Sequence, residues 1–353
     1  MDTGIHEIYL QRCFQLAKLG AGNVAPNPMV GAVLVYDGQI IGEGYHQQYG
    51  EAHAEVHCIQ DALKQHAGLI EQATLYVSLE PCAHYGKTPP CADLIIRHRI
   101  PKVVVGCRDH FEAVNGKGIE KLRNAGVEVI EQIATREAIT LNKRFFTFHG
   151  LKRPYIILKW AQTRDGIMAS GTAARLKISN PVTNRLVHRW RSEEAAIMVG
   201  ARTAVMDDPW LDNRHWFGTA PLKIVLSCSG NLPENLRLFH SGNAAWVFNR
   251  KQTKKLGQAE WINVESDDLV KGMLDLLFER RIQSVFVEGG QQLLQSLIDT
   301  GLWDEARIIT NIAMIAGSGL RAPLLREQVL LQTSMIDTDE VTVYKNIHNQ
   351  FIV

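Results

Sequence analysis

One group of residues constrains the chain more than any other feature: His53-Ala54-Glu55, the pair Pro81-Cys82, and Cys91 after eight intervening residues. An imidazole and two thiolates are typical zinc ligands, and a catalytic zinc site has three protein ligands and an open fourth position. Because these ligands come from separate segments, the fold must bring them to one point. We therefore predict that His53, Cys82 and Cys91 bind one Zn²⁺ ion.

Glu55 lies two positions after the predicted ligand His53. Residues two apart on an ideal helix point about 200° away from each other, so their side chains can converge only where a helix begins. Gly50 and the run at 56–63 predict a helix that begins there. A carboxylate beside the metal, without binding it, can transfer protons between water and a leaving group, a contribution of roughly 10²–10⁴-fold. We predict this catalytic role for Glu55.

Two other interpretations of these residues stay open. A closed structural zinc site would need a fourth ligand, for which His57, Cys58 and His84 are candidates. Without metal, the cysteines would be small buried hydrophobic residues. The order H-x-E, then P-C, then a second cysteine nevertheless resembles the zinc-dependent base deaminases. This order favours a catalytic site, in which zinc lowers the pKa of water from about 15.7 to roughly 7.

The chain as a whole has the composition of an ordinary globular protein. Its 353 residues suggest two domains. A net charge of +1 argues against a nucleic-acid partner, and no segment has the 18 or so successive apolar residues of a membrane span. The N-terminus lacks the apolar core of a signal peptide. The cysteines lack a disulfide spacing, which predicts a cytoplasmic protein: Cys13, Cys58, Cys82, Cys91, Cys107 and Cys228.

The first half alternates strands with helices. After an amphipathic helix at 7–19, a loop with two prolines holds Asn27, which could contact a base edge of a substrate or serve turn chemistry alone. A hairpin is predicted at 30–44. Further strands are predicted at 74–79, 102–106 and 127–130, and further helices at 92–98, 117–124 and 135–146. This order predicts a mostly parallel sheet covered on both faces.

The second half is predicted to be a separate α/β domain. The segment 148–154, with Gly, Pro and basic residues, marks the boundary, which gives domains 1–148 and 149–353. Strands are predicted at 155–160, 196–199, 223–226 and 284–288, and helices at 180–191 and 266–280. Ser266 is the predicted N-cap of the last helix.

The second half contains no zinc motif, but two features could bind phosphate. Arg191 and Arg214 could clamp a phosphate with their planar forks of donors, although both could equally be surface residues. Glu288-Gly289-Gly290 lies between a predicted strand and a helix, where glycine allows close backbone approach and the helix N-terminus favours an anion. The complete G-x-G-x-x-G fingerprint is absent, so this segment predicts only a nucleotide or phosphate site.

Over nearly its full length the chain resembles the bifunctional riboflavin biosynthesis deaminase–reductases. The residues that carry the resemblance are Pro26-Asn27-Pro28, Gly42-x-Gly44-Tyr45-His46, His53-Ala54-Glu55-Val56, Leu79-Glu80-Pro81-Cys82, Pro89-Pro90-Cys91, Asp165-Gly166, Asp207-Asp208-Pro209 and Glu288-Gly289-Gly290. The resemblance implies an α/β protein with an N-terminal cytidine-deaminase-like α/β/α domain and a C-terminal dihydrofolate-reductase-like α/β domain.

The resemblance also implies a reaction. Zinc-dependent hydrolysis would remove the C2 amine of a diaminopyrimidinone that carries a ribosyl 5′-phosphate, and NADPH would then reduce the ribosyl group to ribityl. The implied partner is this small phosphorylated pyrimidine, and the enzyme would be a homo-oligomer. One alternative is a zinc deaminase whose second domain binds a nucleotide but is catalytically silent. Another is a zinc-stabilised binding module without catalysis.

The family's binding positions can be transferred residue by residue. Cofactor positions match Ala161, Thr203, Asp207 and the loop from Gly290, and substrate positions match Arg191, Leu211, Arg214 and Glu288. The segment 175–179 stands where the family commonly has Ser-x-Trp-Ile-Thr. Arg175 therefore takes the place of a substrate-contacting serine and Lys177 that of a cofactor-contacting tryptophan. Cys228 takes the place of a cofactor-side serine.

Overall fold

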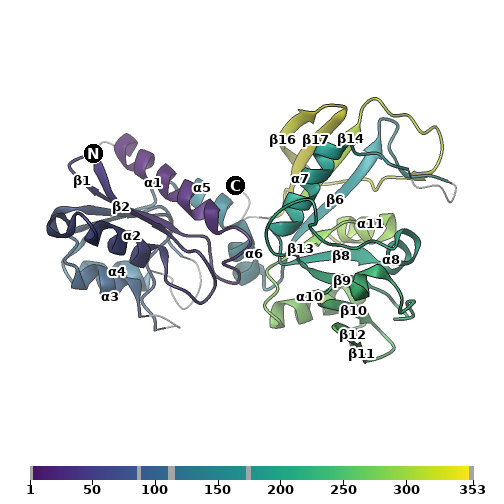
Figure 1. The fold of residues 1–353 in the computed structure, drawn as a ribbon, viewed down its shortest axis with the longest axis horizontal. Helices are drawn as coiled ribbons and strands as arrows, with labels where there is room; N and C mark the ends of the chain where they lie inside the picture. The colour runs from purple at the N-terminus through teal and green to yellow at the C-terminus, as the bar shows by residue number, and fades with distance from the viewer. Residues whose placement is uncertain (1–2, 86–88, 110–115, 172–175, 350–353) are drawn as a thin grey trace. The chain divides into compact units, whose positions relative to one another are not determined.

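The computed structural model describes residues 3–85, 89–109, 116–171 and 176–349. The chain divides into two compact units between Leu151 and Lys152 (Figure 1). The sequence placed the boundary between residues 148 and 149. Helix α6 (Lys143–Leu151) continues through Gly150 and so belongs entirely to the first unit.

A five-stranded sheet forms the centre of the first unit, in the order β2-β1-β3-β4-β5. The hairpin of β1 and β2 is antiparallel, and β1 also pairs antiparallel with β3, whereas β3, β4 and β5 are parallel. The strands are β1 (Gly31–Tyr36), β2 (Gln39–Tyr45), β3 (Thr74–Val77), β4 (Lys102–Val105) and β5 (Glu128–Glu131). The other elements are α1 (Thr3–Ala17), η1 (Lys18–Gly20), α2 (Ala54–Leu63), η2 (Ala67–Gln72), α3 (Cys91–Arg97), α4 (Lys117–Asn124), α5 (Thr135–Leu141) and α6.

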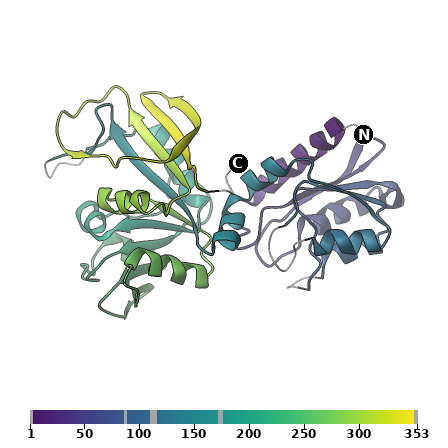
Figure 2. The same ribbon diagram turned by 180° about the vertical axis from the view of Figure 1, so that it is seen from behind.

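Helices cover both faces of this sheet. Helices α1 and α5 lie along one face, and α2, α3 and α4 lie along the other (Figures 1 and 2). Alternate strand residues point to opposite faces. Ala32, Leu34 and Leu75 therefore pack in one buried cluster with residues of α2, α3 and α4. The first unit is an α/β/α sandwich, and its metal-ligand motifs lie at the starts of α2 and α3 and in the loop after β3.

The helix predicted at 135–146 is two helices, α5 and α6, which meet at Asn142. The side chain of Asn142 accepts a hydrogen bond from the Met29 amide at 2.8 Å and donates one to the Met29 carbonyl at 2.9 Å. This pairing with a segment 113 residues away fixes Asn142 outside regular helical geometry. A local helical pattern could not indicate it.

A ten-stranded sheet forms the second unit, in the order β11-β12-β10-β9-β8-β13-β6-β14-β17-β16. Seven strands from β12 to β14 are parallel, and β11, β17 and β16 are antiparallel additions at the edges. The strands are β6 (Tyr155–Thr163), β8 (Ala196–Gly200), β9 (Leu222–Leu226), β10 (Ala245–Asn249), β11 (Lys254–Leu256), β12 (Ala259–Asn263), β13 (Ser284–Val287), β14 (Glu305–Asn311), β16 (Gln328–Ile336) and β17 (Asp339–Asn346). A separate pair joins β7 (Ile167–Ala169) and β15 (Leu320–Arg321).

Two hydrophobic cores lie on the two faces of this sheet. Along β13, Val285 and Val287 belong to the core with α10 and α11, whereas Phe286 belongs to the core with α7 and α9. The helices are α7 (Pro181–Ser192), α8 (Ala201–Asp207), α9 (Arg237–His240), α10 (Leu269–Glu279) and α11 (Gln291–Asp299). The parallel strands are therefore buried on both faces, which is typical of an α/β domain.

The N-cap of α10 is Asp268 and not Ser266, so that prediction was wrong. The Asp268 carboxylate accepts hydrogen bonds from the amides of Val270 at 2.9 Å and Lys271 at 3.1 Å. The Ser266 hydroxyl instead accepts a hydrogen bond from the Asp268 amide at 3.2 Å. Both residue types favour the N-cap position, so the local sequence did not choose between them.

Candidate active sites

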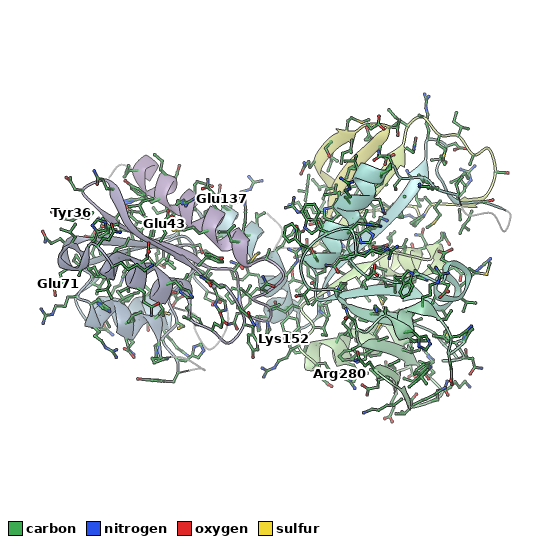
Figure 3. All side chains as sticks on the ribbon, in the orientation of Figure 1. Tyr36, Glu43, Glu71, Glu137, Lys152 and Arg280 are labelled. Carbon is green, nitrogen blue, oxygen red and sulfur yellow. The ribbon has the colours of Figure 1, made fainter. Side chains whose placement is uncertain are left out.

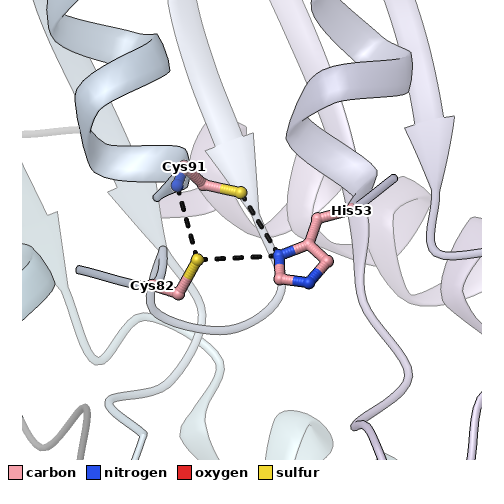
Figure 4. Close-up of side chains that lie close together, drawn as sticks. All are labelled: His53, Cys82 and Cys91. Carbon is pink, nitrogen blue, oxygen red and sulfur yellow. Dashed lines mark hydrogen bonds between the residues drawn. The ribbon is translucent and has the colours of Figure 1, made fainter. Parts of the chain in front are cut away.

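The three predicted zinc ligands meet at the starts of two helices. His53 is the N-cap residue of α2, with extended backbone, and Cys91 is the first residue of α3. Cys82 lies in the loop that follows β3 (Figure 4). The ligand atoms of all three side chains lie within 4.8 Å of one another. The fold thus assembles the histidine and the two cysteines as their chemistry requires.

The spacing of these atoms fits a zinc ion. His53 Nδ1 lies 3.6 Å from Cys82 Sγ and 3.4 Å from Cys91 Sγ (Figure 4). In a tetrahedral site with Zn–N of about 2.05 Å and Zn–S of about 2.3 Å, neighbouring N and S ligands are about 3.6 Å apart. The two N–S separations therefore match those that zinc would impose, with Nδ1 as the ligand atom of His53.

The pKa values of the two thiols are shifted in opposite directions. The hydrogen bond from the Cys91 thiol lowers the pKa of Cys82 to about 4, with help from His53 and from the Cys91 amide. The same interaction, together with burial, raises the pKa of Cys91. The Cys91 amide donates to Cys82 Sγ at 3.3 Å. Ionisation is therefore easier at Cys82 than at Cys91.

Glu55 lies in the first turn of α2, and its side chain is 3% exposed. Its carboxyl interacts electrostatically with the Cys91 thiol. Burial raises the pKa of Glu55, while the nearby His53 opposes the shift. A buried carboxyl beside the ligands, with a pKa moved toward neutrality, is suited to proton transfer.

The described residues do not support a closed structural zinc site. No fourth His, Cys, Asp or Glu joins the three ligands in the part of the chain that the structure describes. The Cys58 thiol instead donates to the carbonyl oxygen of Gly42 at 3.4 Å, and His84 is exposed. Three protein ligands and an open position are the arrangement of a catalytic zinc site.

Asn27 is connected to this site through His46. The Asn27 amide donates to His46 Nε2 at 3.1 Å, and His46 Nδ1 bonds the Ala52 carbonyl at 3.0 Å. Because a carbonyl oxygen can only accept, Nδ1 carries the proton and Nε2 accepts from Asn27; burial lowers the pKa of His46. The His46 ring packs edge-on against that of His53, with centroids 5.3 Å apart. This contact places Asn27 near the zinc ligands, although the sequence assigned no role to His46.

The second unit has a buried charge network around Glu288. Arg191 donates to both carboxylate oxygens of Glu288, at 2.6 and 2.8 Å, and to the Asp212 carbonyl at 2.7 Å. Lys159 Nζ lies 4.0 Å from Glu288. Burial alone would raise the pKa of Glu288, but Arg191 and Lys159 lower it to about 2. The predicted substrate residues Arg191 and Glu288 are therefore each other's partners.

Asp212 links Arg214 to this network. Arg214 Nη1 donates to Asp212 Oδ1 at 2.5 Å, while the Asp212 carbonyl accepts from Arg191. Arg214 has a side chain 49% exposed, against 13% for Arg191. The adjacent Leu211 is buried and has φ of +51°. The two predicted phosphate-binding arginines thus both contact Asp212. Arg191 is largely shielded from solvent, and Arg214 is exposed.

The residues predicted to contact a dinucleotide include a close pair. Thr203 lies on α8, and a Cβ atom added to Gly290 would come within 2.8 Å of its hydroxyl. Gly290 is the N-cap of α11 and provides no side-chain cap. The free amides at the start of α11 beside a hydroxyl can hold a phosphate, and any side chain at Gly290 would occupy that space. The arrangement fits a dinucleotide pyrophosphate.

The other residues predicted to contact the cofactor come from separate strands, helices and loops of the second unit. Ala161 is half-buried on β6, and Asp207 is the exposed last residue of α8. Cys228 is exposed in the loop after β9, and Lys177 is exposed. Arg175 lies outside the described residues. The binding roles of these residues stay predictions.

His188 is a residue that the sequence analysis did not assign. It is 2% exposed, and its Nδ1 has no hydrogen-bond partner among the described residues. Its ring packs against His215 with centroids 4.6 Å apart. Burial and the nearby Arg191 lower its pKa to about 4. In the sequence, His188 could have been found by its position three residues before Arg191 in the same predicted helix, because this spacing places both side chains on one helix face.

Comparison with known proteins bears directly on these sites. Residues 154–347 match the family model described as the RibD C-terminal domain. Residues 4–107 match that of the cytidine and deoxycytidylate deaminase zinc-binding region. The zinc-binding match contains His53, Cys82 and Cys91. The expected fold class, a cytidine-deaminase-like domain followed by a dihydrofolate-reductase-like domain, is confirmed.

Similar proteins match both units together. The riboflavin biosynthesis protein RibD of Aquifex aeolicus is 40% identical over 327 residues, which cover 91% of this chain and 90% of the relative. That of Escherichia coli is 34% identical and covers 89% of each chain. A solved structure from Thermotoga maritima, a diaminohydroxyphosphoribosylaminopyrimidine deaminase/5-amino-6-(5-phosphoribosylamino)uracil reductase, has a TM-score of 0.89 at 35% identity and covers 98% of this chain and 100% of its own. Acinetobacter baumannii RibD has a TM-score of 0.88 at 30% identity, with 98% and 99% covered.

Proposed function

The chain belongs to the RibD family of bifunctional riboflavin biosynthesis deaminases and reductases, and from this premise we propose which substrate, cofactor and residues serve each step. The first unit hydrolyses the C2 amine of 2,5-diamino-6-ribosylamino-4(3H)-pyrimidinone 5′-phosphate to give 5-amino-6-(5-phosphoribosylamino)uracil. The second unit reduces the ribosyl group of that product to ribityl with NADPH. The observation that carries the first step is the cluster of His53, Cys82 and Cys91 beside the buried Glu55.

In the deamination step, His53, Cys82 and Cys91 hold the metal. Bound zinc supplies Lewis-acid activation of water, lowering its pKa to roughly 7. Glu55 would take one proton from this water and pass it to the ring nitrogen, and would then take the second proton from the added hydroxyl and pass it to the departing amine. The C–O bond forms first, and the C–N bond to the amine breaks once the amine has received the second proton, so ammonia leaves and the ring gains a carbonyl. Asn27, held by His46, contacts the edge of the pyrimidine.

In the reduction step, the residues orient the substrate. When bound, NADPH would supply hydride to the anomeric carbon of the ring-opened imine, while the imine nitrogen would take a proton from solvent. Arg191 fixes Glu288 through two of its five donors and Asp212 through a third. Arg214, at the exposed side of the same network, binds the 5′-phosphate together with the remaining Arg191 donors. Leu211 and Arg175 complete the substrate side.

The cofactor lies along the ends of the parallel strands. Thr203 and the start of α11 at Gly290 hold the pyrophosphate, because the absent side chain at Gly290 leaves space beside the Thr203 hydroxyl and the first amides of α11 can donate to an anion. Ala161, Asp207, Lys177 and Cys228 contact the remainder of NADPH. Ligands in open α/β sheets bind at the carboxyl ends of the strands, where β8 and β13 lead into α8 and Gly289-Gly290.

One experiment tests both steps. The zinc-loaded protein receives the diaminopyrimidinone ribosyl phosphate, and ammonia release and NADPH oxidation are followed in the same run. We expect both signals, with ammonia leading. Ammonia alone would leave a deaminase whose second unit binds a nucleotide without catalysis, and neither signal would contradict the proposed substrate.

We expect a cytoplasmic homo-oligomer. β16 pairs only with β17 among the described strands, so its outer edge is open, and it exposes Val329, Leu330, Leu331 and Met335 by 39–54%. An open apolar edge favours association with another chain. Among the described residues, no helix is both long and apolar enough to cross a membrane. Light scattering of the purified protein, and of a Leu330→Glu variant that should dissociate, tests the assembly.

A further inference from the structure

Glu80 lies between β3 and the zinc ligand Cys82, and no step proposed above uses it. Its side chain is 5% exposed. Its carboxylate accepts hydrogen bonds from four backbone amides. These belong to Asp109 at 3.1 Å and Gly116 at 3.0 Å on one oxygen, and to Gly118 at 2.9 Å and Ile119 at 3.4 Å on the other. A buried carboxylate is tolerated when charge-assisted hydrogen bonds of this kind satisfy it.

Two of these amides belong to the first turn of α4. The first amides of a helix have no partner within it, and a side chain at the N-cap usually accepts from them. The N-cap here is Gly116, with φ of +86° and no side chain to do so. Glu80 takes over this function from a distant part of the chain, and its negative charge complements the helix dipole.

The start of α4 also touches the loop that holds Cys82. A Cβ atom added to Gly118 would lie 1.9 Å from the carbonyl oxygen of Pro81, so the two backbones are in direct contact. Only glycine allows this approach. The hydrogen bonds of Glu80 and the close approach at Gly118 therefore hold the Pro81-Cys82 peptide in contact with the start of α4.

Helix α3 holds Cys82 from its other side. The Ala92 amide donates to the Cys82 carbonyl at 3.1 Å, and the Cys91 amide donates to its sulfur at 3.3 Å. Lys121 and Asp93, 2.5 Å apart, join α4 to α3. Cys82 is thus the one zinc ligand outside a helix start, and it depends on two neighbouring helices for its position.

We propose that Glu80 is a positioning residue for zinc: by capping α4 through its carboxylate, it fixes the Pro81-Cys82 loop at the separation from His53 that the metal requires. The inference rests on the proposed function only in taking Zn²⁺ as the metal of this site. Groups that orient metal ligands typically change metal affinity by about 10–100-fold when they are lost. Glutamine at position 80 has one acceptor oxygen and would turn an NH₂ group toward amide donors.

The test measures zinc affinity of the full-length apoprotein by competition with a chromophoric chelator. We expect Glu80→Gln to bind zinc about 10–100-fold more weakly and to weaken the thiolate-to-cobalt charge-transfer absorption of the Co²⁺-substituted protein. Ammonia release should recover toward the wild-type rate when zinc is saturating. NADPH oxidation on the deaminated substrate, which depends on the other unit, should be unchanged.

Two further variants separate positioning from general stability. Glu43→Gln removes another carboxylate of the same unit; Glu43 is labelled in Figure 3. This carboxylate pairs with Arg12 at 2.6 and 2.7 Å, and the variant should keep wild-type zinc affinity. Gly118→Ala replaces neither a ligand nor Glu80, but its Cβ would lie 1.9 Å from the Pro81 carbonyl oxygen and 3.2 Å from Glu80 Oε1. It therefore disturbs both contacts with the start of α4 and should weaken zinc binding. If Glu80→Gln does not fold, Gly118→Ala and the milder Glu80→Asp decide.

The proposal is overturned if Glu80→Gln and Gly118→Ala bind zinc with wild-type affinity, even when their apoproteins melt at lower temperature. In that case Glu80 would only stabilise the fold. Because zinc affinity is measured without substrate, a wild-type protein that released no ammonia would contradict the proposed reaction and leave this result intact.

Discussion

The two sites of this protein differ in how their chemistry is distributed over the chain. In the first unit, three ligands and one carboxyl come from the starts of α2 and α3 and from one loop, with ligand atoms within 4.8 Å. In the second unit, the candidate residues extend over β6, α7, α8 and the segment after β13, and ion pairs join only part of them. The first site is compact and chemically specific, whereas the second is extended.

This difference follows from what each reaction asks of the protein. Hydrolysis needs a side chain of a defined type at each position: imidazole and thiolate for the metal, carboxyl for the proton. In reduction, the cofactor carries the reactive hydride, and the protein orients it through backbone amides, glycines and ion pairs. Side-chain identity is therefore decisive in the first unit and geometry in the second.

The variant with the largest expected effect is Glu55→Gln, which tests whether side-chain identity is decisive in the first unit. We expect the variant to keep its zinc and its fold but to lose ammonia release by roughly 10²–10⁴-fold, since the amide cannot accept and return a proton. Reduction of the separately supplied deaminated substrate should be unchanged. Ammonia release and zinc content are measured on the same preparation.

Glu51→Gln is the matched control, because Glu51 is an exposed glutamate shortly before the same helix. It should be as active as the wild type. An active Glu55→Gln variant would contradict the role of Glu55 and with it the argument that side-chain identity decides this site.

In the second unit, the variant that corresponds to Glu55→Gln is Arg191→Ala. It would leave Glu288 buried without its main cation, which typically costs about 3–5 kcal/mol. We expect this loss in the free energy of unfolding of the second unit, together with loss of NADPH oxidation, while deamination is spared. All seven tryptophans lie after residue 151, so tryptophan fluorescence in urea reports the unfolding of this unit alone.

A double variant sharpens the result. Arg191→Met with Glu288→Leu removes both charges, and apolar pairs of similar size often restore stability. We expect it to recover much of the lost stability without activity. Equal loss of deamination and reduction in either protein would argue against two separate sites.

The Glu288 carboxylate should also make this unit sensitive to acid. Its folded pKa of about 2 lies below its ordinary value of 4.5. The ionised form is thus favoured by folding, and its contribution is complete above about pH 5 and lost as the pH falls toward 2. The difference in urea midpoint between wild type and Glu288→Gln, followed by tryptophan fluorescence, should shrink over this range.

The difference in urea midpoint between wild type and Glu288→Gln reports on the Glu288 carboxylate alone. Asp165 also has a pKa lowered to about 2, by hydrogen bonds from Thr163 and from the amides of Ala316 and Gly317, but it is common to both proteins and cancels. A difference that stayed constant from pH 7 to pH 3 would mean that the ion pair does not stabilise the fold.

The same contrast explains what the sequence could predict. The zinc ligands could be predicted because their types and spacing are dictated by chemistry, and Glu55 is a candidate proton carrier by its position two residues after His53. Helix α4 was predicted with the bounds that the structure has. The pairing of Arg191 with Glu288 joins residues 97 apart, and no local pattern indicates it. Long-range partners also account for the helix break at Asn142 and for the capping role of Glu80.

Arg214→Ala should have the smallest effect on stability and thereby separates binding from folding within the second unit. Its side chain is 49% exposed and pairs with Asp212 at the surface, and such pairs contribute about 0–1 kcal/mol. We expect an unfolding midpoint close to that of the wild type but a raised KM for the phosphorylated substrate, because a phosphate donor is lost. Steady-state NADPH oxidation and the urea midpoint are measured on one preparation. An unchanged KM would remove Arg214 from the phosphate site and leave Arg191, whose guanidinium is already held by Glu288 and Asp212, as the nearer candidate.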